Sequence, residues 1–180
     1  ARLRNVTRFK SRTASAGVNF GIPLSEYNTL GFGATFEDTE IGIDPRFLSL
    51  EVARFILLEG NKFSNIRVNS SFAYDTRNSG LFPTKGVLQQ IRIEVATPPG
   101  DLNYWKVDYD SKVFVPIYKQ YVLLFKTQIG YGDSYGDTYE LPFFENFYSG
   151  GPRTVRGYEE SSLGPKDQFG DSLGGNLAVV

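Results

Sequence analysis

The stretch Tyr104–Val115, YWKVDYDSKVFV, alternates between apolar and charged side chains with a period of two residues. The apolar side chains occupy the odd positions and most of the charged ones the even positions: Trp105, Val107, Tyr109, Val113 and Val115 against Lys106, Asp108, Asp110 and Lys112. Successive side chains of a β-strand point to opposite faces of a sheet. The pattern therefore predicts a strand with one apolar and one charged face.

Five further segments alternate in the same way, at residues 14–22, 30–36, 65–76, 87–97 and 121–131. The run Asn176–Val180 reads as the beginning of another strand. We therefore expect six strands and the start of a seventh. Tight turns are predicted at Pro23–Asn28, Phe82–Gly86 and Pro116–Gln120, and longer links at 38–64, 97–103 and 132–175.

The strand lengths and the alternation of short and long links favour an antiparallel transmembrane β-barrel. Most of the predicted strands reach about ten residues, close to the ~9–11 that a tilted strand needs to cross a membrane. Short turns at one end and long loops at the other are typical of outer-membrane barrels. Aromatic residues near the predicted strand ends suit the girdles of such barrels: Tyr104, Trp105, Tyr131, Phe143, Phe144, Phe147 and Tyr148. The alternative all-β fold is a soluble sandwich with one apolar face per sheet.

The composition excludes several kinds of chemistry. The chain has no cysteine and no histidine, so thiol nucleophiles, thiolate metal sites and His-dependent catalysis are absent. A net charge of −1 gives no basic footprint for nucleic acid. We predict that the protein is not an enzyme and that it has no catalytic residue, cofactor or metal site.

Paired carboxylates are the remaining candidates for an active site. Asp108 and Asp110 share a strand face with Lys106 and Lys112, which is typical of a charge ladder in a hydrated barrel interior. Glu159 and Glu160 are adjacent, whereas a glycosidase needs two carboxyls that face each other across about 5–9.5 Å. A soluble carbohydrate-binding or carbohydrate-cleaving domain is therefore the weaker hypothesis.

The link 38–64 contains a predicted helix. Asp44 is the expected N-cap, Pro45 the first helical residue and Gly60 the C-terminal stop. An apolar stripe of Leu48, Val52, Phe55 and Ile56 would rest on the rim of the barrel. A partner-binding helix is the alternative.

The link 132–175 is too long for an ordinary connection in a compact fold. It contains the run Gly150–Glu160, GGPRTVRGYEE, and an aromatic segment at Phe143–Tyr148. Disordered segments rarely carry that much apolar surface. We therefore expect a packed loop, and the barrel interior is the nearest place for it to pack.

These residues resemble a known family. The run LPFFENFYSGG at Leu141–Gly151, followed by VRGY at Val155–Tyr158 and LGP at Leu163–Pro165, is similar to the sixth extracellular loop of the BamA family. The turn GLFPTKG at Gly80–Gly86 and the strand end VFVPI at Val113–Ile117 match the same family pattern.

The resemblance implies a function and a place in the cell. BamA-type barrels assemble and insert other β-barrel proteins into the bacterial outer membrane. The expected partners are unfolded outer-membrane proteins, the lipid bilayer and, through POTRA domains, accessory assembly lipoproteins. The VRGY motif alone also admits the related two-partner secretion transporters, so a protein-translocating pore is the alternative.

The resemblance also implies which part of the family barrel this chain would form. The family barrel has sixteen strands after its POTRA domains. Residues 1–180 would form part of that outer-membrane domain, from about the sixth strand to the start of the twelfth. The POTRA domains and the first and last strands would be absent.

Four residues of the loop carry over as the functional motif: Val155, Arg156, Gly157 and Tyr158. Arg156 would point into the barrel toward acidic residues of later strands, beyond Val180. A guanidinium in such a place makes bidentate, charge-assisted hydrogen bonds. Gly157 would allow a backbone bend that a Cβ would hinder.

Overall fold

The computed structural model describes residues 2–4, 9–43, 48–119 and 121–180. Its described strands form one antiparallel sheet in chain order, β1-β2-β3-β4-β5-β6-β7-β8. Their bounds are Arg2–Arg4, Phe9–Pro23, Asn28–Ile43, Lys62–Asp75, Gly86–Thr97, Tyr104–Tyr118, Tyr121–Ser134 and Leu177–Val179. Helix α1 spans Leu50–Glu59 and the short 3-10 helix η2 spans Phe143–Glu145. No helix among these residues is long and apolar enough to cross a membrane.

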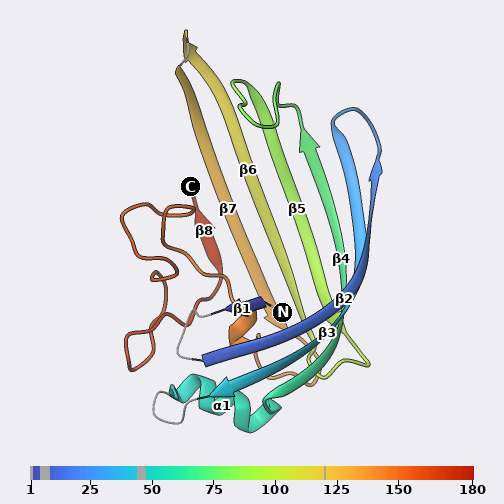
Figure 1. Ribbon diagram of the computed structural model, residues 1–180, viewed down its shortest axis with the longest axis vertical. Coiled ribbons are helices and arrows are strands. Elements are labelled where there is room, and N and C mark those ends of the chain that lie inside the picture. The colour runs from blue at the N-terminus through green and yellow to red at the C-terminus, as the bar shows by residue number, and fades with distance from the viewer. Residues whose placement is uncertain (1, 5–8, 44–47, 120) are drawn as a thin grey trace.

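The six predicted strands are all present, and each is longer than its alternating segment. β2 and β3 contain 15 and 16 residues and pair along their whole common length, from Phe9 opposite Ile43 to Pro23 opposite Thr29. β8 lies where the start of a seventh strand was expected, whereas the short strand β1 was not predicted. The sheet is strongly curved, and the C-terminal loop lies beside β7 and β8 on its concave side (Figure 1).

The two faces of the sheet differ sharply in polarity, as the alternation predicts. We call the face that bears Arg67, Lys106 and Asp108 the inner face. The opposite, outer face is a continuous apolar band whose side chains are 38–62% exposed in this chain: Val18, Phe20, Ile22, Phe32, Phe36, Val68, Phe72, Ile91, Ile93, Val115, Leu123, Phe125 and Ile129. A soluble sheet would bury such a face, so these side chains suit a hydrocarbon solvent.

The connections alternate between two ends of the sheet (Figure 1). The β2–β3 and β6–β7 turns are short, as predicted. The expected tight turn at Phe82–Gly86 is wrong, because the link runs from the end of β4 at Asp75 to the start of β5 at Gly86. Asn78 organises this longer link: its Oδ1 accepts the backbone N–H groups of Thr84 at 2.9 Å and Lys85 at 3.2 Å.

Helix α1 begins later than predicted. Ser49 is its N-cap, and the Ser49 Oγ accepts the backbone N–H of Val52 at 3.3 Å. The N-cap prediction at Asp44 is therefore wrong, while Asp44 and Pro45 themselves lie outside the described residues. Gly60 ends the helix as expected, at φ +97°, and its N–H donates to the Ile56 carbonyl. A serine at the cap supplies the same kind of acceptor as an aspartate, so residue type alone does not show whether Ser49 or Asp44 is the N-cap.

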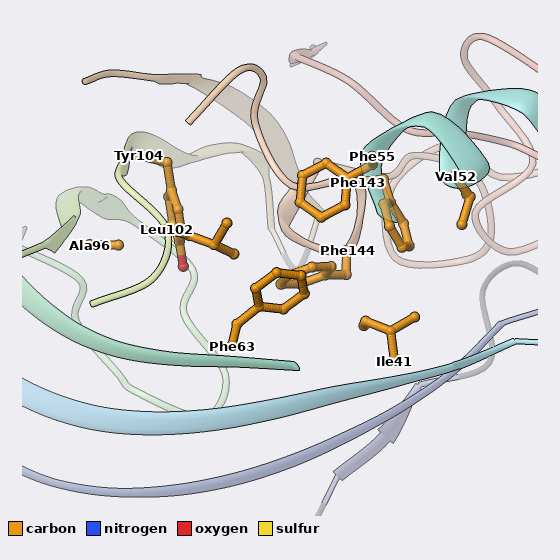
Figure 2. Packing of buried hydrophobic residues seen from close by; sticks show 9 residues of the cluster. All are labelled: Ile41, Val52, Phe55, Phe63, Ala96, Leu102, Tyr104, Phe143 and Phe144. Carbon is orange, nitrogen blue, oxygen red and sulfur yellow. The ribbon is translucent and has the colours of Figure 1, made fainter. Parts of the chain in front are cut away.

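The described core lies at the α1 end of the inner face (Figure 2). It joins one helix, four strands and the C-terminal loop through nine buried residues: Ile41, Val52, Phe55, Phe63, Ala96, Leu102, Tyr104, Phe143 and Phe144. Tyr104, Phe143 and Phe144 were expected in an aromatic girdle and instead belong to this core. Trp105 and Tyr131 remain on the outer face, where their ring centroids are 5.5 Å apart.

Candidate functional site

The long link after β7 is a folded loop. Three isolated antiparallel bridges cross it: Phe147 with Gly175, Ser149 with Leu163, and Lys166 with Ser172. Apart from these bridges its only regular element is η2, and the prediction of a packed loop is confirmed. The loop starts at the rim, runs along the inner face and returns to β8.

The base of the loop is fixed by aromatic contacts. Phe143 packs edge-on against Phe55 of α1 with ring centroids 5.4 Å apart. Phe144 stacks on Phe63 of β4 at 5.9 Å. Tyr148 donates its hydroxyl to the Phe143 carbonyl at 3.0 Å, which closes the turn. Helix α1 thus rests on the rim, as predicted, and also buries the start of the loop.

A charged cluster lies next to this aromatic core. Arg67 of β4 is central: its guanidinium pairs with Glu37 of β3, with Glu94 of β5 at 3.2 Å and with Glu145 of the loop at 3.8 Å. Lys106 of β6 donates to the second oxygen of Glu145 at 2.9 Å. Three carboxylates and two cations therefore converge from four strands and the loop.

This charged cluster was missed by the sequence analysis. Its four strand members occupy inner-face positions, which marks each of them only as one of many polar residues facing the interior, and Glu145 belongs to the irregular loop. The signal that could have found it is the register, because Arg67 lies opposite Thr35 on one side and Ala96 on the other. That places its long side chain within reach of Glu37 and Glu94, two residues away on each neighbouring strand.

The VRGY motif forms an exposed turn beyond the base of the loop. Thr154 shapes its entry, donating its hydroxyl to the Gly150 carbonyl and accepting the Gly150 N–H, both at 2.8 Å. Val155 is half-buried and lines a pocket of about 250 Å³ with Phe147 and Leu163.

The rest of the motif makes few contacts. Arg156 and Tyr158 are exposed, and Arg156 forms no ion pair with the part of the chain that the structure describes. Gly157 adopts φ +92°, a left-handed conformation that favours glycine and fits the expected bend. Just before the motif, the loop is hydrogen-bonded to the barrel wall: Nζ of Lys126 in β7 donates to the Arg153 carbonyl at 2.5 Å. Whether Arg156 meets an acidic partner stays a prediction.

The carboxylates weighed as catalytic candidates have other roles here. Asp110 accepts a hydrogen bond from Gln128 at 2.7 Å, and Asp108 lies 3.9 Å from the Arg92 guanidinium. Both lie on the inner face, as the charge-ladder interpretation requires. Glu159 and Glu160 are exposed at the end of the motif turn.

A sheet with an exposed apolar outer face, a charged inner face and a loop folded along the inside is a section of a transmembrane β-barrel. The Omp85 superfamily domain matches residues 2–180. The chain therefore belongs to the Omp85 superfamily.

The similar proteins agree with this membership. The outer membrane protein assembly factor BamA of Neisseria meningitidis serogroup B is 32% identical over 96% of this chain and 23% of its own length. BamA of Nitratidesulfovibrio vulgaris is 29% identical over 93% of the chain and 21% of its own length. The mouse sorting and assembly machinery component 50 homolog is 31% identical over 60% of the chain and 23% of its own length.

A solved structure shows the same fold. BamA from Haemophilus ducreyi lacking POTRA domains 1–3 superposes with a TM-score of 0.86 over 98% of this chain and 38% of that one, at 21% identity. The chain spans about a quarter of the length of the curated BamA relatives it matches. It is part of an outer-membrane β-barrel.

Proposed function

We propose that this chain supplies part of the wall and the inward-packed loop of a barrel that folds and inserts other β-barrel proteins into the outer membrane. The observation that carries the proposal is the 32% identity to a BamA over 96% of the chain, wall and loop together. The apolar outer face and the loop on the inner face support it. The partners would be unfolded outer-membrane proteins, the lipid bilayer and accessory assembly lipoproteins that bind outside residues 1–180.

The proposed mechanism is structural. The wall perturbs the bilayer locally and incoming strands are templated on the barrel, so that no covalent step and no cofactor is needed. The bacterial relatives are assembly factors by name, which supports a role other than that of an enzyme. The soluble carbohydrate-binding hypothesis finds no support in a sheet whose outer face is apolar and exposed.

The function is tested with the full-length protein in phospholipid vesicles. A urea-denatured outer-membrane barrel protein is added, and its folding is followed by protease resistance. Faster folding than in empty vesicles is the expected result. If folding is not accelerated and a soluble protein is instead transported across the vesicle membrane, the chain belongs to a secretion pore.

Within this function, Val155, Arg156, Gly157 and Tyr158 are the proposed functional motif. Arg156→Ala in the full-length protein is expected to lower barrel stability and assembly together, because a charge-assisted hydrogen bond contributes roughly 1.5–3 kcal/mol. Arg156→Lys is expected to rescue poorly, since lysine lacks the planar fork. Heat-modifiable migration and the levels of other outer-membrane proteins measure the two effects.

The matched control is Arg153→Ala. Arg153 is an exposed arginine three residues earlier whose hydrogen bond to Lys126 uses its backbone carbonyl, which alanine retains. Its replacement is expected to leave both measurements unchanged. Normal migration and normal levels in the Arg156→Ala strain would remove Arg156 from the proposed role.

A further inference from the structure

The inner face of β7 lacks a side chain at Gly130, where the loop crosses it. Gly130 lies opposite Asp108 of β6, and a Cβ added at Gly130 would lie 2.6 Å from Cδ1 of Phe147. Gly130 does not belong to the described glycines with positive φ, so its backbone suits any residue. The glycine is therefore required for space, since the Phe147 ring occupies the volume of the missing side chain.

Glu145, two positions before Phe147, is bound to the barrel wall by ion pairs. Glu145 is only 13% exposed and bridges Lys106 and Arg67, with the shorter contact, 2.9 Å, to Lys106. The Lys106 ammonium also lies 5.0 Å from the centroid of the Phe147 ring. One lysine of β6 therefore contacts both the carboxylate and the ring, which couples the two contacts.

We propose that these five residues form a seat that holds the loop on the inner face independently of Arg156: Arg67, Lys106 and Gly130 on the wall, with Glu145 and Phe147 from the loop. Glu145 and Phe147 are positioning residues, and the VRGY turn is presented from the seat. The relevance of the seat to membrane assembly rests on the proposed function, but its existence does not.

The geometry separates the seat from the motif. The Glu145 and Phe147 side chains are held by β4, β6 and β7, whereas Arg156 is exposed and forms no ion pair with a described residue. Loss of the seat should displace the loop even when Arg156 is intact. Loss of the Arg156 side chain should leave the base of the loop where it is.

The test measures the position of the loop in the full-length protein. Spin labels are placed on cysteines at Glu26, in the exposed β2–β3 turn, and at Arg153, close after the seat; residues 1–180 contain no native cysteine. The distance distribution between the labels is recorded in lipid vesicles by pulsed electron resonance. One narrow peak is expected for the parent and for Arg156→Ala.

Gly130→Ala is expected to broaden or split this peak, because the new methyl group meets the Phe147 ring. Gly21→Ala is the matched control. Gly21 lies on the inner face of β2, and the nearest atom to a Cβ added there is 4.0 Å away. Adding Phe147→Leu to Gly130→Ala should restore the narrow peak. Such a rescue is not expected if alanine merely harmed β7.

Glu145→Gln gives a second, nearly isosteric variant in case Gly130→Ala does not fold. It is expected to broaden the same peak, since the amide loses the charge that faces Lys106. A parent-like peak in Glu145→Gln, or in folded Gly130→Ala, overturns the seat. Failure of the vesicle folding assay with a narrow parent peak would instead contradict the proposed function and leave the seat standing.

Discussion

At the scale of single residues, two arginines have contrasting environments. Arg156, selected by its motif, is exposed, while Arg67 lies at the centre of a cluster with three carboxylates. The Arg67 side chain is 19% exposed, and its Nε is buried without a hydrogen-bond partner among the described residues. A mostly buried cation that neutralises several carboxylates cannot be removed without leaving like charges together.

Replacement of Arg67 by methionine is therefore expected to lower the free energy of unfolding by about 3 kcal/mol. Urea-induced unfolding of the full-length protein in lipid vesicles measures the change. Arg67→Lys should recover only part of it, because one ammonium cannot span the carboxylates as a guanidinium does.

Lys62→Met is the control for the Arg67 substitution. It removes the exposed pair with Glu40, whose N–O distance is 3.1 Å and whose side chains are 69% and 48% exposed. Surface pairs of this kind contribute less than about 1 kcal/mol. Equal effects of the Arg67 and Lys62 variants would mean that the cluster around Arg67 is hydrated and unimportant for stability.

At the scale of elements, α1 and the C-terminal loop depend on each other. Phe55 contacts Phe63 of β4 and both Phe143 and Phe144 of the loop, with ring centroids 5.4–6.2 Å apart. The apolar stripe of the helix was predicted to rest on the rim of the barrel, but its contact with the loop was not predicted. That surface is made when residues almost ninety positions later in the chain fold back onto the rim.

Phe55→Ala is expected to destabilise the barrel domain by about 3–5 kcal/mol, the usual cost of deleting a buried aromatic ring. It should also expose the loop base to added protease in the lipid-embedded protein. Leu57→Ala on the same helix is the control, because Leu57 is 85% exposed, and a change within about 0.5 kcal/mol is expected. A Phe55→Ala effect as small as that of Leu57→Ala would contradict the packing of α1 on the loop.

At the scale of the whole molecule, the sheet separates two solvents. Adjacent residues of β7 illustrate this: Ile129 faces outward with 47% of its surface exposed, whereas Gln128 faces inward and donates to Asp110. The outer band has no protein partner in the described chain. Its exposure is the expected condition of a surface that lipid covers.

Ile129→Lys is expected to lower the free energy of unfolding in vesicles by about 2–4 kcal/mol, the cost of a lysine near the middle of a lipid-facing barrel surface. Gln128→Lys, one residue earlier, should change stability far less, because its ammonium would face the Asp110 carboxylate on the inner face. Heat-modifiable migration with increasing urea compares the two variants. The opposite ranking would mean that the inner and outer faces had been exchanged.

The sequence by itself determined the six long strands, their faces and the kind of solvent on each side. These follow from a period of two residues and from strand length, both of which are local properties of the chain. It also indicated the helix stripe and a packed loop. It could not fix the helix start, because Ser49 and Asp44 are chemically equivalent as caps.

Only the tertiary structure decided which inner-face residues meet. The contacts of Glu145 with Lys106 and of Phe147 with Gly130 join positions 39 and 17 residues apart (145 − 106 and 147 − 130). They depend on strand register and on the path of an irregular loop, and neither leaves a periodic trace in the sequence. Arg156 could therefore be selected from its motif, whereas the buried contacts at the base of the same loop could not be predicted.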